Sequence, residues 1–235
     1  MKVGIIGAMA SEVALLKEQL SEAQVTRVAG MEFCEGALGG TPVVVVQCGI
    51  GKVNAGICVQ VLVDCFGVSH VINTGVAGSL DDRLDVGDLV VSTDCVWHDF
   101  DVTPLGYRPG EIPGVGTINF PADEGLREAT LAAAAQVAPD IHAYAGRVVS
   151  GDQFIASAEQ KNRITEGFGG MCCEMEGTAI AQAAWLNEVP FVVVRAISDK
   201  PGAADQVVDY NTFEEKAARD CAAIVAHMVA NQLRA

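Results

Sequence analysis

The chain has 235 residues, 50% of them hydrophobic, and its 30 acidic and 15 basic side chains give a formal net charge of −15. Because so acidic a surface repels phosphate backbones and anionic lipids, we expect neither a nucleic acid nor a membrane as a partner. The apolar content excludes a disordered chain. The length is typical of a single α/β domain, which we expect to span residues 1–235.

Strand-like and helix-like patterns alternate along the chain. In chain order, the sequence predicts a strand at Val3–Ile6, a helix at Ser11–Leu20, strands at Met31–Leu38 and Pro42–Gln47, a helix at Gly51–Cys65, strands at Val71–Thr74 and Leu89–Ser92, a helix at Gly125–Val137, a strand at Arg147–Ser150, a helix at Ala158–Glu166, a strand at Met171–Met175, a helix at Gly177–Asn187, a strand at Phe191–Ile197 and a last helix at about Asn211–Leu233. The pair Gly39-Gly40 predicts a hairpin between the second and third strands. Together these patterns predict an α/β fold with a mixed central sheet flanked by helices.

The N-terminal segment and the cysteines indicate a cytoplasmic protein. Residues 3–10 end in Ala-Met-Ala, like a signal-peptide cleavage site, but this apolar stretch is too short and contains glycines. No run approaches the roughly 18 apolar residues of a membrane span. The eight cysteines lack the paired spacing of a zinc site, so we expect buried, reduced thiols and no metal.

Three carboxylates follow predicted strands, where open α/β sheets bind their ligands. Glu12 follows the first strand, Glu176 follows Met171–Met175, and Asp199 follows Phe191–Ile197. Each has a structural alternative, because acidic residues are also favoured at helix starts and in turns. All three together favour a site at one edge of the sheet. For Glu174 we expect a structural role, in pairing with a basic residue.

Two patterns that suggest nucleotide binding are rejected. Gly49-Ile-Gly-Lys52 resembles the end of a P-loop, but Val46 replaces the leading glycine and Val53 replaces the residue that would hold magnesium. The Gly4-x-x-Gly7 segment lacks the G-x-G-x-x-G pattern of dinucleotide-binding folds. The four histidines show no metal-ligand spacing.

Six motifs in order, which extend almost from end to end, resemble those of bacterial 5′-methylthioadenosine/S-adenosylhomocysteine nucleosidases. They are Gly4-Ile-Ile-Gly-Ala-Met9-x-x-Glu12, Gly49-Ile-Gly-Lys-Val53, Asn73-Thr-Gly-x-Ala-Gly78, Ser150-Gly-Asp-x-Phe-Ile155, Glu174-Met-Glu176 and Val194-Arg-Ala-Ile-Ser-Asp199. The resemblance implies the fold of the purine nucleoside phosphorylase-like superfamily, a mixed sheet and distorted barrel flanked by helices. It also implies hydrolysis of the N-glycosidic bond of 5′-methylthioadenosine and S-adenosylhomocysteine, without a cofactor, in methionine salvage. 5′-Deoxyadenosine and 6-amino-6-deoxyfutalosine are further substrates that the sequence does not rank.

The resemblance assigns chemical roles to five positions. Asp199 is similar to the acid that protonates N7 of adenine, with Ser198 beside it. Glu12 is similar to the residue that positions and deprotonates the attacking water, with Arg195 nearby, and Glu176 is expected to accept hydrogen bonds from the ribose hydroxyls. These roles agree with the chemistry, because adenine leaves well only as a protonated, neutral base. The reaction therefore needs one carboxylic acid kept protonated at about pH 7 and a second carboxylate to handle water.

The resemblance also assigns binding roles. Phe154 is expected to stack on adenine, the backbone of Ile155 to read its edge, Gly78 to let the backbone approach the ligand, and Met175 to lie against the sugar. The apolar end that receives the 5′-thio group is implied to consist of Met9, Ile50 and Tyr210. Val76 stands where many relatives have serine, and Leu105 and Tyr210 stand where phenylalanine is common. These departures alter the shape of the pocket and leave the three carboxylates untouched.

A homodimer is implied as well, because in this family the partner subunit completes the pocket. Val102 and Pro113 match the donated positions. They lie in residues 95–123, a stretch rich in glycine, proline and polar residues whose length is typical of a functional loop.

Two other functions compete with hydrolysis. A phosphorylase of the same superfamily would need converging cations for phosphate, whereas Arg195 is the only arginine at a predicted strand end and Glu12 would repel the anion. A nucleoside-binding protein without activity would need no acid and base together. We therefore favour the hydrolase.

Overall fold

The computed structural model describes residues 1–233, which form one ten-strand sheet with six α-helices and one short 3₁₀ helix. The strands are β1 Val3–Gly7, β2 Ser21–Val28, β3 Met31–Leu38, β4 Thr41–Gln47, β5 His70–Ser79, β6 Leu89–Trp97, β7 Asn119–Pro121, β8 Ala143–Ser150, β9 Cys172–Glu174 and β10 Phe191–Asp199. The helices are α1 Ala10–Glu18, α2 Lys52–Phe66, η1 Thr103–Leu105, α3 Glu124–Val137, α4 Ala158–Phe168, α5 Gly177–Leu186 and α6 Gln206–Asn231.

Part of the sheet closes into a barrel. Along the sheet the strands follow the order β10-β6-β8-β9-β5-β1-β4-β3-β2, and an additional pairing of β10 with β5 joins five of them in a ring. Strand β10 runs parallel to β5 and antiparallel to β6, so the barrel is mixed. The predicted mixed sheet with a distorted barrel is therefore confirmed.

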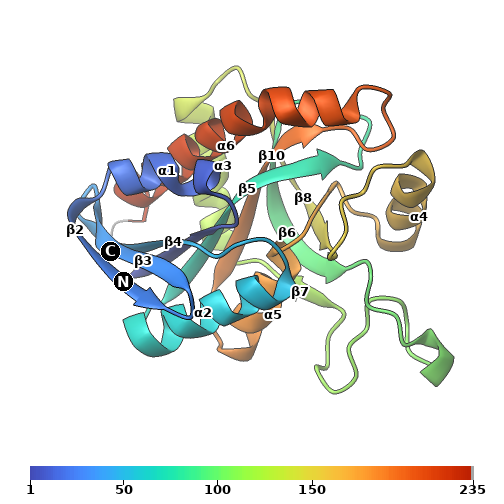
Figure 1. Ribbon diagram of the computed structural model, residues 1–235, viewed down its shortest axis with the longest axis horizontal. Helices are drawn as coiled ribbons and strands as arrows, with labels where there is room; N and C mark the ends of the chain where they lie inside the picture. Colours follow the sequence, from blue (N-terminus) through green and yellow to red (C-terminus); the bar gives the residue numbers. More distant parts are fainter. Residues whose placement is uncertain (234–235) are drawn as a thin grey trace.

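The helices cover two sides of the sheet, with β10 between them. Helices α1, α3 and α6 pack on one side, and α2 and α5 pack together on the other (Figure 1). Strand β10 is buried at all nine positions, as its nearly continuous apolar run predicts. Burial on both faces is the reason that this strand shows no polar alternation.

Several elements differ from the sequence prediction. Strand β2 was not predicted because seven of its eight residues are exposed, which leaves no apolar alternation to recognise. Strand β7 was not predicted either, because it is only three residues long. Helix α6 begins at Gln206 and not near Asn211, and this earlier start places Tyr210 on the helix.

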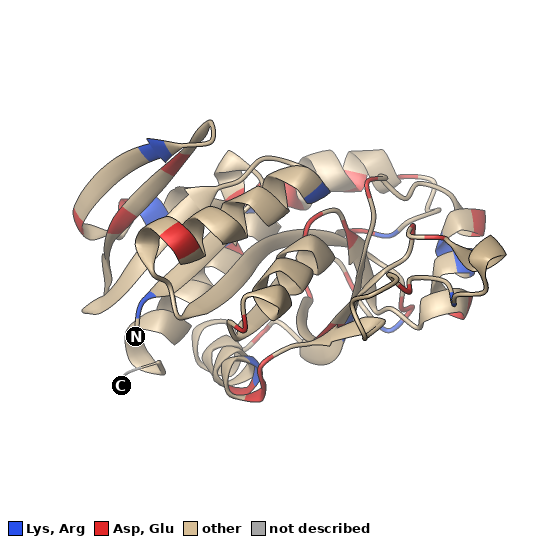
Figure 2. Ribbon diagram, turned by 90° about the horizontal axis from the view of Figure 1, so that it is seen from below, with Lys and Arg blue, Asp and Glu red and all other residues tan. Residues whose placement is uncertain are grey.

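The acidic residues are distributed over the hairpin, the helices and the loops (Figure 2). Some of the few basic residues pair with acids that lie far away in sequence, such as Lys2 with Glu35 at 2.6 Å and Lys161 with Asp82 at 2.8 Å. The two pairs are still partly open to solvent, so each contributes little to stability. Within residues 1–233, no helix has both the length and the apolar character of a membrane span.

Candidate active site

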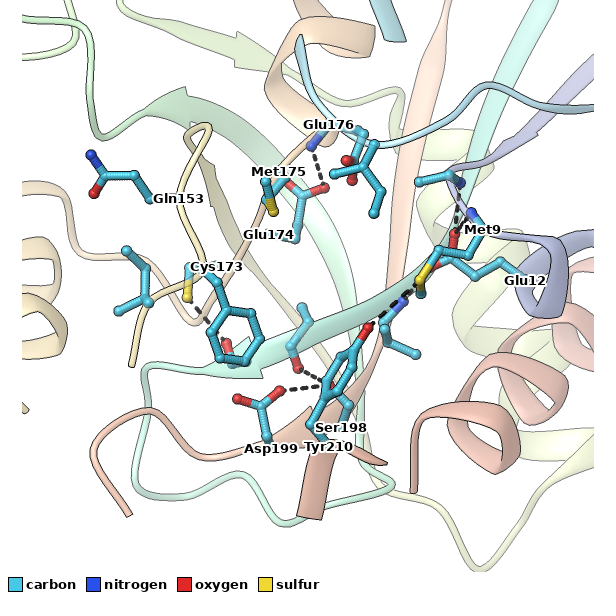
Figure 3. Close-up of a pocket in the computed structure, with 17 residues that line it drawn as sticks. Met9, Glu12, Gln153, Cys173, Glu174, Met175, Glu176, Ser198, Asp199 and Tyr210 are labelled. Atoms are coloured by element: carbon cyan, nitrogen blue, oxygen red, sulfur yellow. Dashed lines mark hydrogen bonds between the residues drawn. The ribbon is translucent and has the colours of Figure 1, made fainter. Parts of the chain in front are cut away.

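One pocket gathers the three carboxylates that follow predicted strands. Its lining is mostly apolar with a few converging polar groups, as in binding sites for small organic ligands. Glu12, Glu176 and Asp199 line it from α1, from the start of α5 and from the end of β10 (Figure 3). The strands do not reach it from a single parallel edge, because β9 runs antiparallel to β5. Strand β5 brings Glu176 and Asp199 together, because Gly78 on β5 pairs with Asp199 at the end of β10 and with Cys173 on β9, three residues before Glu176.

Glu12 both caps its helix and faces the pocket. Its Oε2 accepts hydrogen bonds from the backbone N–H groups of Ala8 at 2.6 Å and Met9 at 2.9 Å, at the start of α1. Its Oε1 accepts from the N–H of Val76 on β5 at 3.1 Å. Burial raises the pKa of Glu12, while Arg195 and the three N–H donors act to lower it. A buried carboxylate with a raised pKa is a stronger base than an exposed one.

Arg195 and Glu174 form an ion pair in the wall of the pocket. The Nη2 atom of Arg195 donates to Glu174 and to Asn73, and Glu174 also accepts from the hydroxyl of Ser150 and from the N–H of Gly177. Burial acts to raise the pKa of Glu174, but the ion pair and these donors hold it below its ordinary value. The structural role expected for Glu174, pairing with a basic residue, is confirmed.

Gly75 allows Glu12 and Arg195 to approach each other. A Cβ atom built on Gly75 would lie 2.3 Å from Oε1 of Glu12 and 2.5 Å from Nη1 of Arg195. No side chain fits at such distances, so a glycine is required here for space and not for its backbone angle.

Glu176 is the N-terminal cap of α5 and lies close to a second acid. Its Oε1 accepts from the N–H of Gly51 at 2.7 Å. Burial, together with the negative charge of Glu174, raises the pKa of Glu176 to about 7. Ligand hydroxyls that donate to this carboxylate would favour its charged form.

Asp199 is held at both oxygens. Oδ1 accepts from the hydroxyl of Ser198 at 2.7 Å, and Oδ2 accepts from Nε2 of Gln206 at 2.8 Å. The Ser198 hydroxyl also lies 3.3 Å from the carbonyl of Ala77, a second acceptor to which it can turn. Burial raises the pKa of Asp199, although both hydrogen bonds act to lower it. Asp199 therefore has the environment of a carboxyl group that can donate a proton.

Apolar and aromatic side chains form the rest of the pocket. The rings of Phe154 and Tyr210 meet edge to face with centroids 5.6 Å apart, and the Tyr210 hydroxyl donates to Sδ of Met9 at 3.6 Å. Phe154 is 48% exposed and Ile50 is 55% exposed. Large apolar groups left open beside buried acids are typical of a binding site for a ligand with apolar and polar parts.

Comparison with known proteins decides the family. The family model of the phosphorylase superfamily matches residues 2–230. The 5′-methylthioadenosine/S-adenosylhomocysteine nucleosidase of Staphylococcus haemolyticus is 41% identical over 229 residues, 97% of this chain and 98% of that protein. The chain belongs to the 5′-methylthioadenosine/S-adenosylhomocysteine nucleosidase family.

Solved structures agree with this nucleosidase family. The enzyme of the same name from Colwellia psychrerythraea, in complex with adenine, has a TM-score of 0.93 at 41% identity and covers 97% of this chain and 94% of its own. The futalosine hydrolase of Helicobacter pylori has a TM-score of 0.91 at 30% identity and covers 97% of each chain. The family predicted from the six motifs is confirmed.

Most of the residues that the nucleosidase motifs single out meet in this pocket. It is lined by Met9, Glu12, Ile50, Val76, Gly78, Phe154, Ile155, Met175, Glu176, Ser198, Asp199 and Tyr210. Arg195 does not line the pocket itself, but it donates a hydrogen bond to Glu174, which does. Val102 and Pro113 do not line it; they belong to the segment 98–118, which projects from the barrel (Figure 1).

Other residues that line the pocket had been given no role. They are Ala8 and Ala77, which belong to the quoted motifs, and Gln153 and Cys173, which lie beside motif residues. Gln206, which contacts Asp199 from α6, lies neither in a motif nor beside one. Within residues 1–233, no three His, Cys, Asp or Glu side chains are grouped as metal ligands.

Breaking the ion pair of this nucleosidase tests its structural role. Replacing Arg195 by methionine is expected to lower the free energy of unfolding by about 3–5 kcal/mol, because the buried carboxylate of Glu174 loses its cation. Urea unfolding monitored by circular dichroism measures the change. Arg83→Met is the matched control, since the Arg83 side chain is 71% exposed and its pair with Asp81 lies at the surface. Equal losses in the two variants would show that Glu174 does not depend on Arg195.

Proposed function

We propose that this chain hydrolyses the N-glycosidic bond of 5′-methylthioadenosine and S-adenosylhomocysteine, releasing adenine and the 5′-thioribose. The observation that carries the proposal is one pocket in which three buried acids, Asp199, Glu12 and Glu176, have raised pKa values, with the pair Asp199 and Glu12 on different elements. Hydrolysis of a nucleoside needs such a pair, because one group must protonate the base while the other accepts a proton from water. The names of the relatives support the substrate class.

In the proposed reaction, protonated Asp199 donates to N7 of adenine as the bond between C1′ and N9 breaks. The base leaves neutral, and the sugar passes through an oxocarbenium-like state. Water attacks C1′ and loses a proton to ionised Glu12, so the products are adenine and the free sugar. Burial raises the pKa of Glu12, and the cation of Arg195 acts against this rise and so favours the charged form that accepts the proton. Glu176 would accept hydrogen bonds from the ribose hydroxyls, with Met175 against the sugar.

The two ends of the pocket suit the two ends of the nucleoside. At the acid end, Phe154 and Ile155 belong to the lining, where Phe154 would stack on adenine and the backbone of Ile155 would read its edge. A Cβ atom built on Gly78 would lie 2.9 Å from Cγ of Pro201 and 3.3 Å from Oδ2 of Asp199, so a larger residue would crowd this end of the pocket. At the other end, Met9, Ile50 and the ring of Tyr210 would receive the 5′-thio group, and Val76 also belongs to the lining.

The lining favours water over phosphate as the second substrate. No lysine, arginine or histidine is among the residues from 1–233 that line the pocket, whereas four acids are. A phosphate dianion would meet Glu12 without an exposed cation to offset the repulsion. We therefore propose hydrolysis and not phosphorolysis.

Product analysis with and without phosphate tests this proposal. 5′-Methylthioadenosine is incubated with the protein in both buffers, and the products are separated by chromatography. Adenine and free methylthioribose are expected in both. Methylthioribose 1-phosphate that appears only with phosphate would establish a phosphorylase instead. 5′-Deoxyadenosine and 6-amino-6-deoxyfutalosine, tested in parallel, examine the wider substrate range that the Helicobacter pylori neighbour suggests.

The 5′ end gives a second test. Adenosine carries a bare 5′-hydroxyl, which would lose bound water at an end lined mainly by Met9, Ile50 and the Tyr210 ring. We expect its kcat/KM to be roughly 10- to 200-fold below that of 5′-methylthioadenosine, the range for a small group in a hydrophobic pocket. Steady-state rates of adenine release measure the ratio. Equal efficiencies would contradict the assignment of Met9, Ile50 and Tyr210 to this end.

We further propose that the protein is a homodimer in which Val102 and Pro113 of one copy complete the pocket of the other. Support comes from the projecting segment 98–118 (Figure 1), where Leu105 is 74% exposed. Light scattering is expected to give twice the chain mass. A fully active monomer at nanomolar concentration would contradict the proposal.

The eight free cysteines support a reducing, cytoplasmic location, and we propose methionine salvage as the process that the enzyme serves.

A further inference from the structure

Gln206, the first residue of α6, makes hydrogen bonds in three directions. Its Nε2 donates to Oδ2 of Asp199 at 2.8 Å and to the carbonyl of Ile155 at 2.7 Å, and its Oε1 accepts from the N–H of Gly202 at 3.1 Å. The side chain is 3% exposed. The three partners set the orientation of the amide, because in the reverse orientation its oxygen would face two acceptors.

These bonds join two parts of the site that are far apart in sequence. Asp199 is the last residue of β10, whereas Ile155 belongs to the loop after β8, 51 residues before Gln206. The same start of α6 carries Tyr210, which contacts Phe154 and Met9. One side chain therefore connects the acid, the loop that would bind the base and the helix that closes the pocket.

We propose that Gln206 is a positioning residue that holds Asp199 and the Ile155 backbone at a fixed separation, so that the acid meets N7 of the leaving adenine. The inference rests on the proposed function, because it assigns no role to Gln206 unless Asp199 protonates a leaving base. Asp199 has a second donor in Ser198, but Ser198 is its direct neighbour on β10 and cannot relate the acid to the Ile155 loop. Within residues 1–233, only Gln206 bonds to both.

Two consequences separate positioning from simple anchoring of α6. Misplacing the acid by a fraction of an ångström affects the chemical step, so kcat should fall more than KM rises. In addition, an N–H that donates to a carboxylate favours its charged form, so its removal raises the pKa of Asp199. Because the acid works only when protonated, the alkaline limb of the rate profile should then move to higher pH.

Other titratable groups near Asp199 do not produce the same shift. Asp209 and Tyr210 approach it from α6, and Cys173 approaches it from β9. Burial raises the pKa values of Cys173 and Tyr210 above their ordinary, already alkaline values. None of these residues is altered in the variants. A shift of the alkaline limb of the pH–rate profile therefore reports on the bond between Gln206 and Asp199.

The experiment compares Gln206→Met and Gln206→Glu with Val207→Ala, a control on the same helical turn whose side chain is 60% exposed. Methionine keeps the length of glutamine without its donors. Glutamate keeps the shape but places a second carboxyl against Asp199. For each protein, kcat, KM and the pH profile are measured with 5′-methylthioadenosine and with a p-nitrophenyl 5-methylthioriboside, whose leaving group needs no proton. Wild-type release of adenine from 5′-methylthioadenosine establishes the proposed function independently.

Both Gln206 variants are expected to lose roughly 10- to 100-fold in kcat on the adenine nucleoside and to move the alkaline limb upward. The p-nitrophenyl substrate should be cleaved at nearly the wild-type rate, which also shows that the variants are folded. Equal losses on both substrates, with an unmoved limb, would make Gln206 only an anchor for α6. Wild-type rates in both variants would overturn the inference, whereas an inactive wild type would overturn the proposed function itself.

Discussion

Asp199→Asn is expected to lower the rate of adenine release on the order of 10²–10⁴-fold, equivalent to roughly 3–5 kcal/mol of barrier. Asparagine keeps the size of the side chain and one acceptor, but it has no proton to give to N7. Burial raises the pKa of Asp199 in the wild type and so favours its protonated form, whereas asparagine has no such acid form. Steady-state kinetics with 5′-methylthioadenosine measure the loss.

A substrate with a better leaving group provides the control for Asp199. The p-nitrophenyl 5-methylthioriboside leaves without protonation, so it should lose much less activity in Asp199→Asn. Asp205→Asn, which changes an exposed acid just before α6, should leave both rates unchanged. If Asp199→Asn harms both substrates equally, Asp199 is not the general acid.

Glu12→Gln is expected to impair both substrates, by a similar order of 10²–10⁴-fold. An amide cannot take the proton of the attacking water, whatever the leaving group. The amide also cannot accept from all three backbone N–H groups of Ala8, Met9 and Val76, because its nitrogen is a donor. The variant thus loses the general base and one hydrogen bond from a backbone N–H. The rates on both substrates measure the combined effect of these two losses.

A matched change on the same helix separates these two losses. Glu18→Gln removes an exposed carboxylate from the last turn of α1 and should not alter activity. Thermal unfolding of Glu12→Gln reports how much the missing backbone contact destabilises the fold. If this variant is as active as the wild type on both substrates, the Glu12 carboxylate only caps α1.

Local sequence patterns were sufficient to predict features that depend on one strand or helix and its direct neighbours in the chain. The predicted range of β3 matches the observed Met31–Leu38, and Gly39-Gly40 forms the hairpin to β4 as expected. Hydrophobic periodicity succeeds here because it reports which face of an element is buried. It fails for β2, whose residues face solvent on both sides at the edge of the sheet.

The sequence by itself determined the α/β class, the family and the three carboxylates, because apolar runs and ordered motifs are local properties of the chain. Only the tertiary structure decided that β10 closes a barrel onto β5, that Arg195 pairs with Glu174 and that Gln206 reaches both Asp199 and Ile155. Each of these depends on which distant segments pack together. Several alternative pairings would bury the same apolar surface, so periodicity cannot choose among them, whereas the folded chain adopts the arrangement in which its buried charges and amides find partners.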